Sequence, residues 1–205
     1  MGPTRIESLG GKRYIMVVVD DFTRYTSVIL LRFKFGAPEH IEVLCTRLQN
    51  EKNLKIDRIR SDHSREFENS YMKSFCTRSG ISQEFSAPIT PQQNGVVEKK
   101  NKVIQEMARA MLYNKDVARN LWGEIVNSAC HTVNRVYFRS STKKTSYELW
   151  KGRKPNVKYF RIFESTCFIP KDRENVGKFD SRSDEGIFLG YSSTSKAYQV
   201  YNKES

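Results

Sequence analysis

Residues 85–101, FSAPITPQQNGVVEKKN, decide the fold class, because the chain changes there from one kind of secondary structure to another. ISQEFS (81–86) has the composition of a short strand, and the two prolines and the glycine that follow break regular structure. From Val96 to about Tyr113 the sequence predicts a helix with one apolar stripe: Val97, Ile104, Ala108 and Met111. A strand, a loop and a long helix in this order favour an α/β protein.

The residues before this stretch continue the alternation of strands and helices. YIMVVV (14–19) and TSVILL (26–31) are apolar runs typical of neighbouring strands, and KIDRIR (55–60) is a short strand that ends just before Asp62. A helix between them has one apolar face: Ile41, Leu44, Cys45 and Leu48. A second helix is expected within residues 66–80, ending at Gly80, with one apolar side: Phe67, Tyr71 and Phe75.

The residues after this stretch predict one more helix, followed by a region of short strands. LWGEIVNSACHTVNRV (121–136) has a helical pattern. Beyond Lys154 and Pro155 come short aromatic strands separated by charged turns: FRIFESTCFIPK (160–171), EGIFLGYS (185–192) and AYQVYN (197–202). The sequence therefore predicts an α/β domain over residues 1–150 and a small all-β module over residues 157–205.

Composition narrows the class of partner. The chain has 205 residues, a net charge of +12 and a pI near 9.6, which favours a polyanion, nucleic acid before a membrane surface, although a solvated basic surface would give the same charge. The cysteines are widely separated and fit neither a zinc finger nor a disulfide framework, so we expect buried free thiols. We expect no membrane span, because no apolar run approaches about 18 residues.

Two carboxylates are candidates for the chemistry. Asp62 lies at the end of a predicted strand, and Glu98 lies in the first turns of a predicted helix, with 35 residues between them. Such a pair can share divalent cations, as in two-metal phosphoryl transfer, and hard carboxylate oxygens suit Mg²⁺. The spacing alone does not exclude two ordinary surface charges.

Six segments of the chain together resemble the integrase core of copia-type LTR retrotransposons: GGKRYIMVVVDDFTRYT (10–26), RSDHSREF (60–67), FSAPITPQQNGVVEKKN (85–101), ARAML (108–112), ELWKGRKP (148–155) and FLGYS (188–192). The resemblance implies a ribonuclease-H-like α/β fold, with a mixed sheet and flanking helices, followed by an SH3-like β module. It also implies a catalytic triad of two Asp and one Glu, in which Asp62 and Glu98 match the last two members and bind Mg²⁺ or Mn²⁺. The implied partners are retroelement cDNA ends and target DNA, acted on in the nucleus by a homo-oligomer of the full-length enzyme.

The helix that carries Glu98 also offers DNA contacts. Glu98, Lys102, Gln105 and Arg109 are spaced to share one helical face. Lys102 and Arg109 suit contacts to DNA phosphates, and the resemblance supports Lys102, with Gln92 and Asn94 in the loop nearby. The alternative is a solvated face with a Glu–Lys pair four residues apart.

The chain also departs from the family pattern. The family's first catalytic Asp would precede Gly2 and Pro3, so we expect the core to lack its first strand and one metal ligand, and both ends to be cut. Asp20 and Asp21 are expected to be structural, with a metal role as the alternative. Ser64 and Glu164 stand where the family usually has Gly, which is costly if either position needs a positive φ. No zinc is expected, because the zinc-binding module would lie upstream.

The most direct prediction is DNA integration by a DDE-type polynucleotidyl transferase core that is inactive as this fragment. Two other hypotheses remain open at this point. One is a non-enzymatic, basic DNA-binding remnant of a decayed retroelement, and the other is a ribonuclease-H-like nuclease that cuts DNA without joining it.

Overall fold

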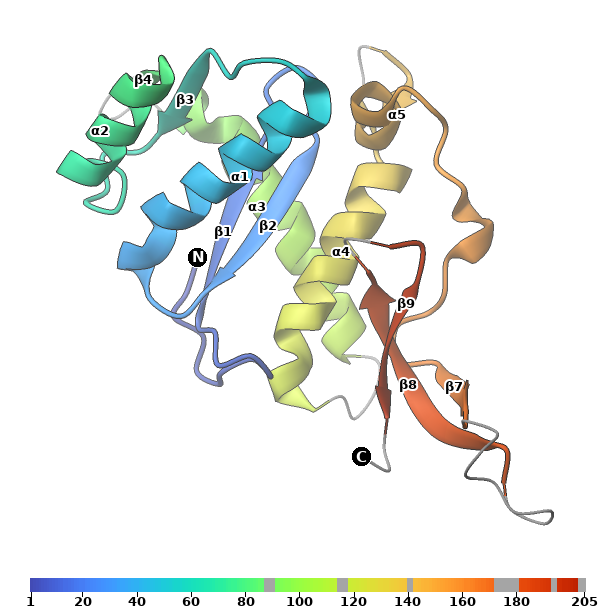
Figure 1. Cartoon of the computed structure of the whole chain (residues 1–205). Helices are drawn as coiled ribbons and strands as arrows, with labels where there is room; N and C mark the ends of the chain where they lie inside the picture. The colour runs from blue at the N-terminus through green and yellow to red at the C-terminus, as the bar shows by residue number, and fades with distance from the viewer. Residues whose placement is uncertain (87–90, 114–117, 140–141, 172–180, 193–194, 203–205) are drawn as a thin grey trace. The chain divides into compact units, whose positions relative to one another are not determined.

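A computed structural model describes residues 1–86, 91–113, 118–139, 142–171, 181–192 and 195–202, with the side chains of residues 91–94 left out (Figure 1). The chain forms two compact units. The first contains residues 1–19 and 27–102, and the second contains residues 20–26 and 103–205. Each unit is described by itself. In the described residues, every helix is too short or too polar to cross a lipid bilayer.

The first unit holds the strands and helices that carry the candidate site. Its elements are β1 (Tyr14–Val19), β2 (Thr26–Leu31), a 3₁₀ turn (Lys34–Gly36), α1 (Ala37–Lys52), β3 (Arg58–Ser61), α2 (Ser70–Ser79), β4 (Ser82–Phe85) and the start of α3 (Pro91–Tyr113). β1 pairs with β2, and β3 pairs with β4 in a separate sheet. Within the described residues no strand pairs with both sheets.

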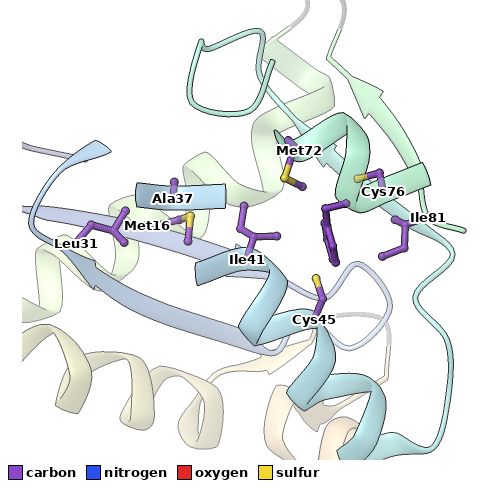
Figure 2. Packing of buried hydrophobic residues seen from close by; sticks show 9 residues of the cluster. Met16, Leu31, Ala37, Ile41, Cys45, Met72, Cys76 and Ile81 are labelled. Atoms are coloured by element: carbon purple, nitrogen blue, oxygen red, sulfur yellow. The ribbon is translucent and has the colours of Figure 1, made fainter. Parts of the chain in front are cut away.

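A single apolar cluster holds this unit together. It joins Met16 of β1 and Leu31 of β2 to one face of α1 and one face of α2. Figure 2 shows Ile41 and Cys45 of α1 facing Met72 and Cys76 of α2. Met72 is fully buried, so the α1–α2 contact excludes water at its centre. The predicted apolar face of α1 is thereby confirmed.

The second predicted helix is shorter than the sequence indicated, and Tyr71 was wrongly placed on its buried side, whereas Phe75 lies in the apolar cluster and Phe67 packs against it, as predicted. α2 begins at Ser70 because the Asn69 side chain accepts a hydrogen bond from the Met72 N–H (2.9 Å) and caps the helix. Its buried face is Met72, Phe75 and Cys76, whereas Tyr71 is exposed. The Tyr71 hydroxyl donates instead to a carboxylate oxygen of Glu42 on α1 (2.6 Å). The stop at Gly80 is confirmed, with φ at +65°.

The long helix begins five residues earlier than predicted. α3 starts at Pro91 rather than at Val96. A proline in the first turn costs little, because its missing N–H would have no partner inside the helix and its fixed φ suits a helix. The proline and glycine that indicated a loop therefore lie inside the first turns. Ile104 and Ala108 are buried, as the predicted apolar stripe requires.

The second unit contains the rest of α3 and all later elements. These are a 3₁₀ turn (Arg119–Leu121), α4 (Trp122–Val136), β5 (Phe138–Arg139), β6 (Lys144–Thr145), α5 (Ser146–Lys151), a 3₁₀ turn (Val157–Tyr159), β7 (Thr166–Pro170), β8 (Ser183–Tyr191) and β9 (Tyr198–Asn202). β7, β8 and β9 form an antiparallel sheet, which confirms a small β module at the C-terminal end.

The Asn134 side chain ties α4 to the segment 20–26. Its Oδ1 accepts from the Thr26 N–H (2.9 Å) and its Nδ2 donates to the Thr26 carbonyl (2.8 Å). Cys130, one helical turn earlier, donates to the same carbonyl through Sγ (3.2 Å). Asn134 and Thr26 are each 2% exposed, so water cannot replace either amide bond.

Replacing Asn134 should destabilise the protein strongly. An Asn134→Ala variant leaves the buried Thr26 N–H without its acceptor and removes one donor to the Thr26 carbonyl, so we expect a loss of at least about 2 kcal/mol. The exposed Asn127 on the same helix supplies the control, Asn127→Ala, which should cost well under half as much. Chemical denaturation measures both, and equal losses for the two variants would contradict this account.

β8 packs closely on α4. The Ser128 hydroxyl donates to the Leu189 carbonyl (3.0 Å). At Gly190, where φ is +148°, an added Cβ would lie 2.5 Å from the Ser128 Oγ. The glycine of the FLGYS segment is therefore required by this close approach as well as by its backbone conformation.

The two positions where the family usually has Gly behave differently. Ser64 has no positive φ, so serine carries no backbone strain there. Glu164 has φ at +66°, and its Oε2 is buried without a hydrogen-bond partner among the described residues. The Glu164 N–H donates to the Phe188 carbonyl (2.8 Å), which fixes this strained loop against β8.

A Glu164→Gly variant should therefore be more stable than the parent. Glycine removes the left-handed strain and the buried carboxylate, and we expect a gain of about 1 kcal/mol, seen as a higher midpoint of thermal unfolding. Glu164→Ala removes the carboxylate but keeps most of the strain, so it should gain less. If alanine gains as much as glycine, the strain is not the cause.

Candidate functional site

Asp62 lies at the end of β3, at an edge where two parallel strands finish together. β3 and β4 pair in parallel from Arg58 opposite Ser82 to Ser61 opposite Phe85. The Ser86 N–H still donates to the Ser61 carbonyl (2.9 Å), so the pairing extends to the point where Asp62 begins. Because both strands end at this edge, Asp62 after β3 and Ser86 after β4 lie at the same edge of the sheet.

The Asp62 carboxylate is exposed and forms few interactions with the described part of the chain. Its Oδ1 accepts a hydrogen bond from the Ser64 N–H (3.2 Å). The Ser64 carbonyl then accepts from the N–H groups of Phe67 and Glu68 (2.9 Å each), which closes the turn after Asp62. Among the described residues the carboxylate has no ion pair, so its oxygens remain available to a cation.

Charged side chains hold this turn in place. Lys34, in the 3₁₀ turn before α1, lies 3.3 Å from a carboxylate oxygen of Glu66. The pKa of Glu66 is lowered mainly because its carboxylate accepts a hydrogen bond from the backbone N–H of Glu66 itself. Hydrogen bonds from Ser64 and Lys34 lower it further. His63 stacks on Phe85 of β4 with ring centroids 4.9 Å apart. These contacts fix the position of the segment that follows Asp62.

The start of the chain runs beside β1 and close to this turn. The Met1 amino group donates to the Ile15 carbonyl (2.8 Å), and the Ile15 N–H donates to the Met1 carbonyl (2.9 Å). Burial lowers the pKa of the Met1 amino group, Lys34 lowers it further, and Asp62 and Glu66 raise it.

The structure places the other predicted residues along α3. Glu98 and Lys102 are exposed in the first unit, and Arg109 is exposed farther along the helix, in the second unit. Among the described residues, Glu98 forms no hydrogen bond or ion pair. Gln92 and Asn94 belong to the first turn of α3, but their side chains lie outside the described residues. Gln105 is half-buried and has an interaction of its own, so it is less free than its neighbours to meet a ligand.

Asp20 and Asp21 form a turn. The Asp20 Oδ2 accepts from both the N–H (2.7 Å) and the hydroxyl (2.6 Å) of Thr23, and the Asp21 carboxylate pairs with Arg24. Both hydrogen bonds to Asp20 would compete with a metal for the same oxygen. The geometry therefore agrees with the structural role expected of this pair.

The donor atoms at Asp62 and Glu98 fit a hard divalent cation. Both offer carboxylate oxygens that face solvent, and Mg²⁺ takes few protein ligands and keeps several waters. Within the described residues, no group of three or more His, Cys, Asp or Glu side chains is placed to hold a metal. Cys45, Cys76 and Cys130 are buried free thiols, as predicted, whereas Cys167 is a free thiol that is only half-buried. Burial raises the pKa of Cys45 to about 11.

His131 of α4 packs against β8 in the second unit. Its ring stacks face to face on Tyr191 of β8, with centroids 3.8 Å apart, and its Nδ1 is buried without a hydrogen-bond partner in the described part of the chain. Burial lowers its pKa to about 3, and Arg135 adds to this shift. His131 is therefore a neutral packing residue of the second unit.

This shift predicts a contribution of His131 to acid sensitivity. An unfolded histidine binds a proton below pH about 6.5, whereas the folded one stays neutral down to pH about 3. The unfolded state thus binds more protons in this window, so His131 lowers the stability as the pH falls.

A His131→Phe variant keeps the stack on Tyr191 but cannot bind a proton. When the pH is lowered from 7.5 to 4.5, the thermal midpoint of the variant should fall less than that of the parent, each being compared with its own value at pH 7.5. Parallel curves for the two proteins would refute the assignment.

Two family models match the chain. The integrase core domain matches residues 3–91, and the retroviral polymerase SH3-like domain matches residues 165–205. The first match includes Asp62 and ends at Pro91, where α3 begins. The second covers β7, β8 and β9.

Curated relatives match nearly the whole chain. The chain is 29% identical over 201 residues to the retrovirus-related Pol polyprotein from transposon TNT 1-94 of Nicotiana tabacum, a match that covers 98% of the chain and 15% of that protein. It is 30% identical over 186 residues to the corresponding polyprotein from transposon RE1 of Arabidopsis thaliana, a match that covers 91% of the chain and 13% of that protein. The chain thus spans only a small part of these relatives.

Solved structures share the fold. A chain of the simian T-cell lymphotropic virus intasome in complex with PP2A regulatory subunit B56 gamma matches with a TM-score of 0.56 at 16% identity, over 92% of this chain and 69% of that one. The catalytic core domain of BIV integrase matches with a TM-score of 0.51 at 17% identity, over 67% of this chain and 85% of that one. The predicted ribonuclease-H-like α/β fold is confirmed.

Proposed function

We propose that the chain, which matches the integrase core domain over residues 3–91 and the retroviral polymerase SH3-like domain over residues 165–205, is part of a DNA integrase of a copia-type retrotransposon. The reaction is a polynucleotidyl transfer, in which a water or a DNA 3′-hydroxyl attacks a phosphodiester and a new 3′-hydroxyl leaves. The substrates are retroelement cDNA ends and target DNA, which implies action in the nucleus. As part of the full-length enzyme, the chain acts in a homo-oligomer.

The observation that carries this proposal is the state of Asp62. Asp62 lies within the integrase-core match, at the edge where β3 and β4 end. Its carboxylate accepts only one weak hydrogen bond from the protein. Asp62 and Glu98 would hold Mg²⁺ or Mn²⁺, and such ions activate the attacking oxygen and stabilise the leaving one. The role of the protein is to present the two carboxylates without neutralising them.

The exposed cations of α3 would position DNA. Lys102 lies four residues after Glu98 on the same face of the helix, so a phosphate held by Lys102 lies near the metal-binding carboxylate. Arg109 follows two turns later, and Gln92 and Asn94 precede Glu98 in the first turn. Contacts of this kind bind the DNA backbone without reading the sequence.

Metal binding tests the two carboxylates directly. We expect Mn²⁺ to bind the 205-residue chain, followed by paramagnetic relaxation of water protons, and we expect Asp62→Asn and Glu98→Gln each to weaken binding about tenfold or more. Asp57, with a side chain 91% exposed in the same unit, gives the control variant Asp57→Asn, which should bind Mn²⁺ like the parent. Equal binding by all four proteins would exclude this site.

Mn²⁺ binding and DNA cutting separate the integrase from the other hypotheses, and strand transfer by the chain alone would contradict the inactivity expected of this fragment. The sequence supplies two of the three carboxylates that the resemblance implies, so we expect the chain alone to perform no strand transfer. Salt-sensitive DNA binding without any site for Mn²⁺ would favour the non-enzymatic remnant instead. Metal-dependent cutting without joining would favour the nuclease.

A further inference from the structure

Two phenylalanines are exposed beside the candidate site. Phe33 and Phe35 lie between β2 and α1, with 51% and 77% of their surface exposed. Their rings are stacked on each other, with centroids 5.1 Å apart and planes 7° from parallel. A single exposed apolar residue is common on protein surfaces, and these two differ in that they form one stacked aromatic pair.

The local sequence explains why these rings face outwards. Leu31 at the end of β2 and Ala37 at the start of α1 are both 3% exposed and belong to the apolar cluster of the first unit. The residues between them must cross from the strand to the helix over the surface. Neither phenylalanine belongs to that cluster, so packing does not account for them.

The loop that carries the rings is fixed next to Asp62. Lys34 lies between the two phenylalanines, and its ammonium group is 3.3 Å from the carboxylate of Glu66. Glu66 belongs to the turn that begins at Asp62.

The chemistry of this surface suits a nucleobase. The Arg32 guanidinium lies 5.7 Å from the centre of the Phe33 ring, so a positive charge lies next to the two stacked rings. Stacked aromatic rings next to a basic group are how proteins hold unpaired bases, because every base has a face that can stack. A base inside a duplex has both faces covered, so the surface would take an unpaired base.

A second copy of the chain fits this surface less well. An aromatic side chain buries about 150–250 Å², so two rings provide well under the roughly 1,000 Å² of a stable protein interface. The net charge of +12 also disfavours two copies meeting at a basic loop, and it favours a polyanion.

We propose that Phe33 and Phe35 form a stacking platform for an unpaired base at the end of a DNA substrate whose backbone is held near Asp62. The platform would position the DNA end and would take no part in the chemistry. This inference rests on the proposed function, because it assigns a position to the substrate of the same site.

The test compares two DNA duplexes of equal length, one blunt and one with a short 3′ overhang that contains the fluorescent base 2-aminopurine. The full chain should bind the overhang duplex more tightly and quench its fluorescence. A Phe33→Ala/Phe35→Ala variant should lose about tenfold in affinity for the overhang duplex and most of the quenching, and should keep its affinity for the blunt duplex.

Three further variants make the outcome specific. Leu54→Ala removes another exposed apolar side chain of the same unit (71% exposed) and should leave both affinities unchanged. Phe35→Trp should retain the preference, because indole also stacks. Phe33→Leu/Phe35→Leu keeps the apolar surface without the rings and should behave like the alanine variant, so retained binding would overturn the stacking assignment.

The failures of the two proposals can be distinguished. If the alanine variant binds both duplexes like the parent, the platform is wrong and the proposed function stands. If the parent binds neither duplex, both proposals fail. If sedimentation shows that the alanine changes dissociate a dimer and leave DNA binding intact, the surface is a contact between copies and the platform is wrong.

Discussion

The parallel pairing of β3 with β4 is the constraint on which the candidate site depends. Parallel strands need a crossover, and here α2 provides it, held by the burial of Met72, Phe75 and Cys76 against α1. Because both strands then end at one edge, Asp62 after β3 and Ser86 after β4 lie at that same edge. The ion pairs of Glu84 with Arg58 (2.8 Å) and Arg60 (3.2 Å) lie on the exposed surface of this pair and add little by themselves. The apolar crossover therefore keeps Asp62 at this edge.

Much of the fold could be predicted because apolar periodicity reports burial directly. β1, β2 and α4 lie where their apolar residues recur, and the aromatic strands near the C-terminus form one sheet. The errors lie at helix starts, where a single residue decides. Asn69 starts α2 through one side-chain hydrogen bond, and Pro91 begins α3 although prolines and glycines ordinarily indicate a loop. The apolar pattern of a segment does not show at which residue its helix begins, because that depends on a single capping side chain or proline.

Contacts between distant residues could not be predicted at all. The amide of Asn134 completes the hydrogen bonding of Thr26, 108 positions away, and nothing in either local sequence indicates that pairing. The same holds for the stacked Phe33 and Phe35, which look like ordinary apolar residues next to a strand. The resemblance did indicate that Glu164 replaces a glycine, and its positive φ bears out the strain, but Ser64 was flagged for the same reason and is relaxed. A family pattern shows that a residue is unusual, and only the backbone angle shows whether it is strained.

The carboxylates near the sheet differ in the number of hydrogen bonds and ion pairs that they form with the protein. This difference separates acids with a structural role from candidate cation ligands. Asp20 accepts two short hydrogen bonds from Thr23, and Glu66 is bound by Lys34 and by its own backbone. Asp62 receives a single long one, and Glu98 has none among the described residues. A fold that satisfied Asp62 as it satisfies Asp20 would gain local stability and lose any site for a cation. The exposure of Asp62 and Glu98 therefore agrees with the role that we propose for this pair.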